Sequence, residues 1–407
     1  MRLSSRVKDI NESITLKLNA KAVELAEEGK TIYNLTAGQL PFRPMNEFVE
    51  LIRSESDFLK SFQYSPVAGY PELKKKILEN FQETRGVDLA SSGVEFDCVV
   101  SNGGKHCLSN IFGSLIDHGD EIILMAPYWV SYPEMIKFCK GVPIVVETSP
   151  FDVFVPSIEE IKRKISQKTK AIVINSPNNP TGTHYSEEWM KDFAELMKAH
   201  PDVAIISDEI YYQLYYYDPK PTYFYQFAPE LLDRTIIVDG ISKTLASTGL
   251  RIGYTIAPKE LTKVISKLQG QTTSGANSLV QRALSHFDFH QIPVYLNPIK
   301  KHLRENAELL GEAFRANNLS QSWYQPLSAF YYLIDFTQIP LMERLVKEGR
   351  DGTDLSVEIC EMLLEEYGIA VVPGIAFGMP NTARMSLVSE RELFNEAVVK
   401  LMKFLCQ

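Results

Sequence analysis

Thr235-Ile-Ile-Val-Asp239-Gly-Ile-Ser-Lys243-Thr-Leu-Ala-Ser-Thr-Gly-Leu-Arg251-Ile-Gly-Tyr254 is the most informative stretch of this 407-residue chain. It begins with a β-branched apolar run, and a second apolar run starts at Ile252. The loop of small residues between the runs carries Lys243 and, eight positions later, Arg251. A lysine in such a pocket loses its proton readily and becomes a nucleophile, and an arginine binds anions with a planar fork of donors. Most lysines and arginines are instead solvated, so the prediction of a reactive lysine depends on partners elsewhere in the chain.

Short apolar runs of the same kind recur before this stretch, with helical segments between them. Because the runs are continuous rather than alternating with polar residues, they indicate strands buried on both faces of a largely parallel sheet. We therefore expect an α/β fold with a three-layer domain, in which helices cover both faces of the sheet. The expected strands are 96–101, 121–125, 143–147, 171–175, 203–208 and 235–239.

The chain is long enough for two domains. We expect a large α/β domain at 47–290 and a small α+β domain at 291–407. An N-terminal segment, 1–46, with an amphipathic helix at 13–30, is expected to pack with the small domain. The stretch 336–353 has the least regular pattern and is expected to form a loop or a mobile flap.

Composition and charge exclude several functional classes. With 45% hydrophobic and 23% charged residues, the chain has the composition of a soluble globular protein. A net charge of −9 without a basic block argues against nucleic acid as a partner, and no apolar run is long enough to span a membrane. The N-terminus shows no secretory signal. Five scattered cysteines lack the paired spacing of metal ligands and fit a reducing cytoplasm.

Polar residues follow several expected strands, at the sheet edge where α/β proteins place binding groups. Gly103 and Gly104 precede a helix and suit an anion, although a plain tight turn fits equally well. Asn179 follows another strand, where a turn held by asparagine side chains is the simpler interpretation. Asp208 ends a further strand and needs a buried partner, either a protonated heterocycle or an ordinary cation. Arg384 lies in an apolar strand and should bind a carboxylate, from a substrate or from the protein.

Eight motifs extend these observations along nearly the whole chain: Tyr64…Gly69, Asn102-Gly-Gly-Lys105, Pro127-Tyr-Trp129, Asn178-Asn-Pro-Thr-Gly182, Asp208-Glu-Ile-Tyr211, Ser242-Lys243 with Arg251, Val372-Pro-Gly-Ile-Ala-Phe-Gly378 and Arg384-Met-Ser386. Their identity and order resemble those of the fold-type I, class I pyridoxal-phosphate aminotransferases. The similarity is greatest to the bacterial aspartate aminotransferase-like subgroup. Each motif is weak alone, but their common order makes chance agreement a poor explanation.

The resemblance implies a pyridoxal 5′-phosphate site in the large domain of a homodimer. Lys243 would join the cofactor aldehyde as a Schiff base and carry protons, Asp208 would pair with the ring nitrogen, and Tyr211 would hydrogen-bond the ring oxygen. Arg384 would clamp the substrate α-carboxylate, helped by the backbone of Gly38. The resemblance implies that Lys105, Trp129 and Asn179 would contact both the cofactor and the substrate. Further cofactor contacts would come from Gly103, Gly104, Ser242, Arg251 and, from the neighbouring subunit, Tyr64.

The expected reaction moves an amino group from L-aspartate to 2-oxoglutarate in a pyridoxal/pyridoxamine ping-pong cycle. Lys105 would face the acidic side chain, unless it serves only charge balance at the phosphate. Ser13 and Thr15 would cover the substrate. One alternative is an aromatic, prephenate-type or broad-range aminotransferase, favoured by the tyrosine-rich runs Tyr211 to Tyr217 and Tyr223 to Phe227. The others are a pyridoxal-phosphate lyase or decarboxylase on the same fold, and a non-catalytic paralogue.

Two segments depart from the usual family pattern. Gly38-Gln-Leu-Pro-Phe42 replaces Gly-Glu-Pro-Asp-Phe in the segment over the substrate. Ser328-Ala-Phe-Tyr331 replaces Gly-Ala-Phe-Tyr near the domain interface. Neither departure removes an expected catalytic group.

Overall fold

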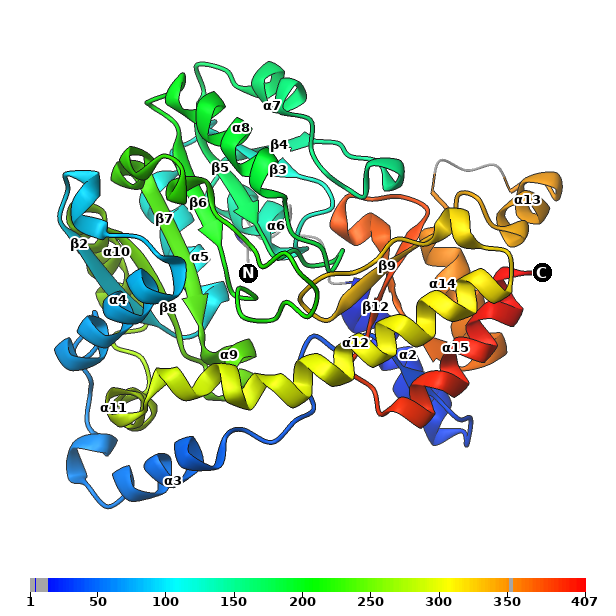
Figure 1. Ribbon diagram of the computed structural model, residues 1–407, viewed down its shortest axis with the longest axis horizontal. Helices are drawn as coiled ribbons and strands as arrows, with labels where there is room; N and C mark the ends of the chain where they lie inside the picture. Colours follow the sequence, from blue (N-terminus) through cyan, green and yellow to red (C-terminus); the bar gives the residue numbers. More distant parts are fainter. Residues whose placement is uncertain (1–3, 5–13, 351–353) are drawn as a thin grey trace.

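The computed structural model describes residue 4 and residues 14–350 and 354–407, and its largest unit is a seven-stranded sheet (Figure 1). Its strands are β2 (Phe96–Ser101), β3 (Glu121–Met125), β4 (Val142–Val146), β5 (Thr169–Asn175), β6 (Ala204–Asp208), β7 (Thr235–Gly240) and β8 (Gly253–Pro258). They lie in the order β2-β8-β7-β6-β5-β3-β4. Only β8 runs antiparallel to its neighbours within this sheet. The mostly parallel sheet predicted from the apolar runs is confirmed.

Helices cover both faces of this sheet because successive strand residues point to opposite sides and both sets are apolar. Ile206 and Val238 face one layer, whereas Ile205 and Ile237 face the other. The first layer consists of α5 (Gly104–Leu115), α6 (Ser131–Phe138) and α10 (Lys259–Thr272). The second consists of α4 (Pro71–Arg85), α7 (Ile158–Lys164) and α8 (Glu187–Lys198). The three-layer prediction is therefore confirmed.

The register of the sheet brings polar strand ends together. Asn175, at the end of β5, pairs with Asp208, at the end of β6. Because side chains alternate between faces, Asp208 faces the α5 layer and Glu209 faces the opposite layer. The next strand, β7, leads directly into α9 (Ile241–Thr244), a single short turn that carries Lys243. Asp208 and Lys243, which are more than thirty residues apart in sequence, thus lie at the same edge of the sheet.

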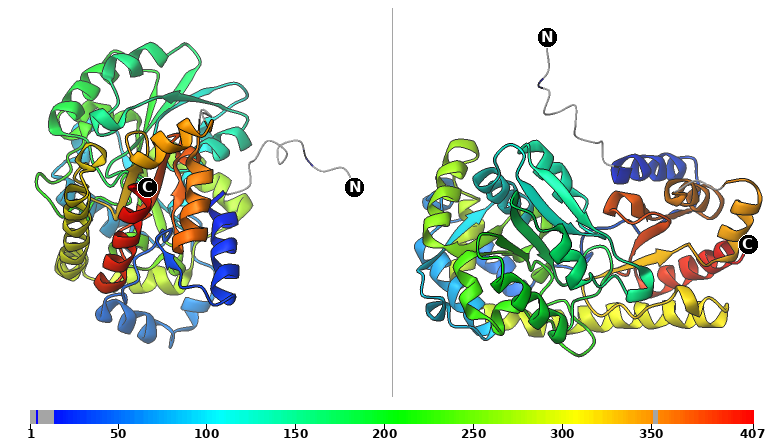
Figure 2. Two further views of the ribbon diagram at one scale, coloured as in Figure 1. Left: turned by 90° about the vertical axis from the view of Figure 1, so that its right-hand side faces the viewer. Right: turned by 90° about the horizontal axis from the view of Figure 1, so that it is seen from above.

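A smaller, three-stranded sheet lies in the C-terminal part of the chain. It contains β9 (Tyr331–Asp335), β11 (Val372–Pro373) and β12 (Thr382–Ser386) in the antiparallel order β11-β12-β9, and β1 (Tyr33–Asn34) pairs separately with β10 (Ile369–Ala370). The N-terminal helix, α2 (Ile14–Glu27), packs beside β10 and β11, and the long α12 (Ile292–Ala316) runs along one side of the molecule (Figures 1 and 2). Further helices are α3 (Asn46–Glu55), α11 (Ser278–His286), α14 (Ser356–Tyr367) and α15 (Arg391–Leu405). Within the described parts of the chain, no helix has the length and apolar character needed to cross a membrane.

The stretch 336–353 contains a helix, so the prediction of a loop or flap was wrong for residues 340–347. The helix, α13 (Pro340–Lys347), begins with Pro340, whose fixed φ suits a first helical turn. It buries Leu341 and Leu345, which lie one turn apart. Two such positions give too short a periodic pattern to identify a helix from sequence. Residues 351–353 lie outside the described residues.

A buried ion-pair cluster ties α4 to the ends of β6 and β7. Arg85 Nε donates to Glu209 Oε2 at 2.8 Å, and Arg85 Nη2 donates to Asp239 Oδ2 at 3.2 Å. The guanidinium carbon lies 3.3 Å from the centre of the Tyr212 ring. Tyr225 adds a hydroxyl that donates to Glu209 Oε1 at 2.8 Å. Each buried charge therefore has the partner that its desolvation requires.

Replacing Arg85 with Met should destabilise the protein by about 3–5 kcal/mol, because two buried carboxylates lose their cation. Lys191→Met is the matched control, since Lys191 pairs with Glu187 on the surface, where such pairs contribute about 0–1 kcal/mol. Urea unfolding at one protein concentration measures both changes. Equal losses of stability in the two variants would contradict a structural role for the buried cluster.

Candidate active site

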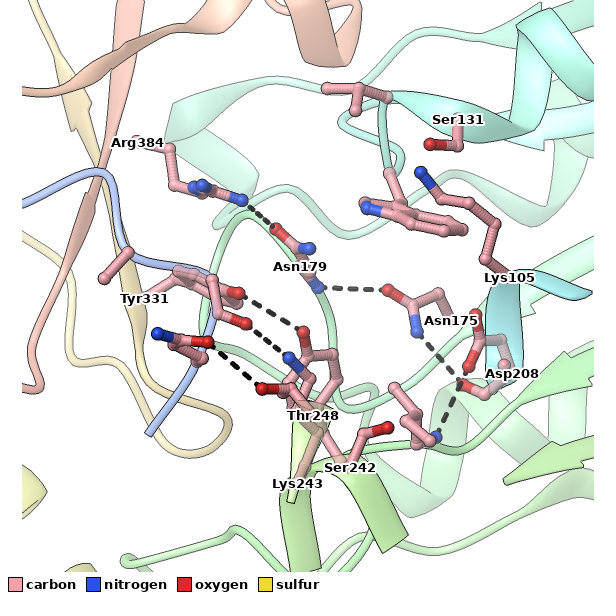
Figure 3. Close-up of a pocket in the computed structure, with 18 of the residues that line it drawn as sticks. Lys105, Ser131, Asn175, Asn179, Asp208, Ser242, Lys243, Thr248, Tyr331 and Arg384 are labelled. Carbon is pink, nitrogen blue, oxygen red and sulfur yellow. Dashed lines mark hydrogen bonds between the residues drawn. The ribbon is translucent and has the colours of Figure 1, made fainter. Parts of the chain in front are cut away.

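A cavity of about 650 Å³ lies between the carboxyl ends of β5, β6 and β7 and the small sheet (Figure 3). The described residues that line it include one carboxylate, Asp208, against the cations Lys105, Lys243, Arg251 and Arg384. This excess of positive charge suits a ligand with several negative groups. Most residues predicted from sequence meet here, namely Gly38, Gly104, Lys105, Trp129, Asn179, Asp208, Tyr211, Ser242, Lys243, Arg251 and Arg384.

Asp208 lies buried at one end of the cavity. Tyr132 donates its hydroxyl proton to Asp208 Oδ2 at 2.6 Å, and the Ile210 N–H donates to Oδ1 at 3.3 Å. Burial raises the pKa of Asp208 to about 6, while the hydrogen bond from Tyr132 opposes that rise. A carboxylate so placed is stabilised in its charged form by a nearby cation, such as a protonated ring nitrogen.

Lys243 extends from α9 into the cavity. Its Nζ donates a hydrogen bond to the carbonyl oxygen of Gly38 and lies 5.6 Å from the centre of the Tyr211 ring. Burial lowers the pKa of Lys243 to about 7, and the charges of Arg384 and Arg251 act in the same direction. A large fraction of the amine is therefore unprotonated and nucleophilic at neutral pH.

The start of α5 and Arg251 form a cradle for an anion. Gly103 has a φ of 87°, and a Cβ there would lie 2.6 Å from Arg251 Nη2, so only glycine fits. Arg251 Nη2 also donates to the carbonyl oxygen of Asn102 at 3.3 Å. Gly103 does not line the cavity itself but borders the lining residue Gly104. The helix N-terminus, Arg251 and nearby Ser242 together supply donors that suit a phosphate.

Arg384 reaches the cavity from β12, the central strand of the small sheet. Its Nη1 donates to Asn179 Oδ1 at 3.0 Å, and its Nη2 donates to the carbonyl oxygen of Thr36 at 2.9 Å. The rings of Tyr331 and Phe377 flank the guanidinium, with centres 4.4 and 5.0 Å from its carbon. Arg384 Nε is buried without a hydrogen-bond partner among the described residues. No carboxylate among the described residues pairs with this guanidinium, which therefore suits a carboxylate group of a ligand.

Lys105 and Trp129 form another wall of the cavity. Lys105 Nζ lies 5.0 Å from the centre of the Trp129 ring, and the side chain extends toward Ser131 (Figure 3). Burial lowers the pKa of Lys105, and the charge of Arg251 lowers it as well. No carboxylate in the described part of the chain forms an ion pair with Lys105. An anionic group bound here would meet a cation that the protein itself does not neutralise.

Tyr64 is not brought to the cavity of its own chain. Its side chain is 94% exposed. Of the two residues expected to cover the substrate, Ser13 lies outside the described residues, and the side chain of Thr15 is likewise not described.

Three residues that line the cavity had no role predicted from the sequence: Tyr132, Asn175 and Tyr331. Asn175 Nδ2 donates to the carbonyl oxygen of Asp208 at 3.0 Å, and its place at a strand end is the same signal that pointed to Asp208. Tyr132 is the second residue of α6, and its N–H donates to the carbonyl oxygen of Trp129, three positions earlier, at 3.0 Å. Tyr331 carries no such signal, because the face that a short strand turns toward a cavity is set by packing.

Comparisons with known proteins agree with this geometry. Residues 30–401 match the family model of aminotransferase class I and II. The chain belongs to this family. It is 35% identical to the aspartate/prephenate aminotransferase of Thermus thermophilus over 99% of this chain and 98% of that protein. It is 34% identical to the aspartate aminotransferase of Geobacillus stearothermophilus over 100% and 99%. A double mutant of the Thermus thermophilus aspartate aminotransferase has a similar structure, with a TM-score of 0.88 at 35% identity over both full chains.

Membership in this family implies pyridoxal phosphate, and the cavity of this aminotransferase offers a suitable group for each part of that molecule. Asp208 suits a protonated ring nitrogen, and the weakly basic amine of Lys243 suits an aldehyde. The cradle of Gly103 and Arg251 suits the phosphate. At the other end, the unpaired Nε of Arg384 suits the carboxylate of an amino acid.

The lowered pKa of Lys243 predicts an unusual reactivity in the cofactor-free aminotransferase. Reductive methylation with formaldehyde should modify Lys243 with a midpoint near pH 7, because only the neutral amine reacts and it is lost below that pH. Ordinary lysines have a pKa of about 10.4, and Lys191 on the surface of α8 is the internal control. Mass spectrometry of peptides follows both sites. A midpoint for Lys243 equal to that for Lys191 would contradict the lowered pKa.

Proposed function

We propose that this aminotransferase moves the amino group of L-aspartate to 2-oxoglutarate, using pyridoxal phosphate bound in the cavity. The observation that carries the proposal is a pair of cavity-lining cations, Arg384 from β12 and Lys105 from α5, for which the described part of the chain supplies no carboxylate partner (Figure 3). Both substrates are dicarboxylates, so each has one carboxylate for Arg384 and one for Lys105. Charge-assisted hydrogen bonds to both groups favour such substrates over neutral ones.

The residues around the cofactor would each hold one part of it. When bound, the cofactor supplies an electron sink for the negative charge left on the substrate Cα. Asp208 would keep the ring nitrogen protonated, and the hydrogen bond from Tyr132 would hold Asp208 in its charged form. Tyr211 would donate to the ring oxygen. The remaining contacts would come from Trp129, stacked on the ring, and from Asn179. The phosphate would be bound by the backbone N–H groups of Gly103, Gly104 and Lys105 and by the side chains of Ser242 and Arg251.

Lys243 would be the group that moves the proton. Its neutral Nζ, favoured by the pKa of about 7, would remove the proton from the substrate Cα. It would then deliver this proton to the former aldehyde carbon of the cofactor, which receives the amino group. Arg384, with the backbone of Gly38, would hold the α-carboxylate so that this proton faces Lys243. Because one Arg384 clamp serves donor and acceptor, the two must bind in turn, which is a ping-pong sequence.

Prephenate is a second candidate acceptor. The Thermus thermophilus relative is named for both aspartate and prephenate. Prephenate is also a dicarboxylate, so its second carboxylate can use Lys105 in the same way. The proposal for Lys105 therefore covers both acceptors and does not depend on which one the cell supplies.

Replacing Lys105 with Ala should raise the KM for aspartate and 2-oxoglutarate about tenfold or more, because a charged hydrogen bond of about 1.5–3 kcal/mol is lost. The KM for a neutral donor such as alanine should change little, since alanine leaves Lys105 unpaired. Lys105→Arg keeps a cation and is the matched control. Steady-state rates with each donor measure the difference. Equal changes for aspartate and alanine would refute the proposed preference.

We also propose a homodimer in which Tyr64 of each chain reaches the phosphate of the other. The side chain of Tyr64 is 94% exposed, and the nearby Leu59 and Phe62 are exposed by 74% and 70%. A cluster of exposed apolar side chains of this kind marks a protein contact surface. Because Tyr64 does not line the cavity of its own chain, a contribution to catalysis requires a second copy.

Hybrid dimers test this arrangement. Tyr64→Ala and Lys243→Ala homodimers should both be impaired, the first through weaker cofactor binding and the second through loss of the amine. A hybrid of the two chains contains one site with an intact Lys243 and an intact Tyr64 from its partner, so activity should return after mixing and refolding. Activity that stays at the level of the separate variants would show that Tyr64 does not act across the dimer.

The domain division and cellular location are proposals as well. We propose that 47–290 binds the cofactor, that 291–407 brings the carboxylate clamp, and that 1–46 packs with the latter. Lys243 and Asp208 come from the first range, Arg384 comes from the second, and α2 contacts β10 and β11, which supports this division. The scattered, unpaired cysteines of the described chain support a cytoplasmic location.

A further inference from the structure

The hydroxyl groups of Tyr331 and Tyr211 lie 3.3 Å apart at the wall of the cavity. Tyr211 belongs to the loop after β6, whereas Tyr331 is the first residue of β9 in the small sheet. Both side chains are buried, and burial raises the pKa of each hydroxyl. Both therefore keep their protons at neutral pH, and either can donate in the contact between them.

The backbone holds Tyr331 in this place. Its register partner in β12 is Ser386. On the other side, Gly182 lies so close that a Cβ there would be 2.0 Å from the carbonyl oxygen of Tyr331. The N–H groups of Leu327 and Ser328 both donate to the carbonyl oxygen of Gly182 at 2.8 Å. Tyr331 cannot move without displacing the loop around Gly182, which packs against its backbone.

The ring of Tyr331 contacts a second functional group. Its centre lies 4.4 Å from the guanidinium carbon of Arg384, which is a favourable cation–π distance. The ring also meets the Tyr211 ring edge to face, with centres 6.0 Å apart at 81°. Tyr331 is thus in contact with the residue proposed to hold the cofactor ring oxygen and with the one proposed to hold the substrate carboxylate (Figure 3).

The number of protons fixes the direction of the hydrogen bond once a cofactor is bound. Each phenol has one proton to donate and lone pairs to accept. If Tyr211 donates its proton to the ring oxygen, as proposed above, the proton between the two hydroxyls must come from Tyr331. Donation to Tyr211 also strengthens Tyr211 as a donor, since hydrogen bonds in a chain polarise one another.

We infer that Tyr331 is a positioning residue for both ends of the site: its hydroxyl orients the proton of Tyr211 toward the cofactor, and its ring orients Arg384 toward the substrate. This inference rests on the proposed function. It assigns the hydroxyl and the ring to separate tasks. The two tasks can be removed one at a time, because phenylalanine keeps the ring and leucine keeps neither.

In Tyr331→Phe, the pH at which the visible absorbance of the bound cofactor changes should rise by about half a unit. The hydrogen bond from Tyr211 stabilises the ring oxygen of the cofactor in its negative form. A weaker hydrogen bond therefore favours the protonated form of the bound cofactor. Pyridoxal phosphate should also bind about fivefold more weakly. The KM for aspartate should stay within about twofold, because the ring beneath Arg384 remains.

Tyr332→Phe is the matched control for the hydroxyl. Tyr332 is the next residue of β9, is equally buried, and donates its hydroxyl to the carbonyl oxygen of Ser322 at 2.7 Å, away from the cavity. Any loss of protein stability from removing a buried hydroxyl should be similar in Tyr331→Phe and Tyr332→Phe, whereas only Tyr331→Phe should shift the absorbance transition. The same shift in both variants, or no shift in Tyr331→Phe, would overturn the role of the hydroxyl.

A third variant, Tyr331→Leu, tests the ring. Succinate, a dicarboxylate without an amino group, should bind to the cofactor-loaded Tyr331→Leu protein about fivefold more weakly than to Tyr331→Phe. Equal affinity in the two variants would overturn the role of the ring. Failure of the unmodified protein to bind pyridoxal phosphate at all would instead overturn the proposed function, and this inference with it, so the two failures are distinguishable.

Discussion

Desolvation of two opposite charges, on Asp208 and Lys243, governs the chemistry of this site. Burial disfavours the charged form of each group, which raises the pKa of Asp208 to about 6 and lowers that of Lys243 to about 7. Hydrogen bonds offset part of the cost of burying the two groups: Tyr132 donates to Asp208, and Lys243 donates to the carbonyl oxygen of Gly38. Burial of these groups destabilises the fold, but it also suits them to a ligand that is a protonated heterocycle with an aldehyde. Asp208 suits the protonated ring nitrogen, and the neutral amine of Lys243 suits the aldehyde.

The remaining functional groups are arranged around that pair by two separate sheets. The large sheet supplies the anion cradle and Lys105, whose positions follow from strand and helix ends. The small sheet supplies Arg384 on its central strand and Tyr331 on the strand beside it. A substrate that contacts Lys105 and Arg384 together therefore bridges the two sheets. If the proposed function holds, amino-transfer chemistry would depend on Asp208 and Lys243, whereas substrate choice would depend on groups at the edges of the cavity.

Sequence patterns predicted the parts of the site that have a local signal. Lys243 follows a continuous apolar strand, and Arg384 is a charge within one, so both stood out before the fold was known. Two of the residues that were missed depend on contacts between distant segments: Tyr331 acquires its place from Gly182, and Arg85 meets Glu209 and Asp239 only after α4 packs on the sheet. Periodicity also fails for short elements, which is why α13 was predicted as a loop.

The most direct test of amino transfer in this cavity is a single half-reaction. L-Aspartate is added, without any oxo acid, to the cofactor-loaded protein, and oxaloacetate, ammonia and the visible absorbance are followed together. Amino transfer through Lys243 predicts one burst of oxaloacetate equal to the bound cofactor, loss of the visible band, and no ammonia. Continued release of oxo acid in step with ammonia would identify a lyase, and absence of any oxo acid would contradict an aminotransferase acting on aspartate.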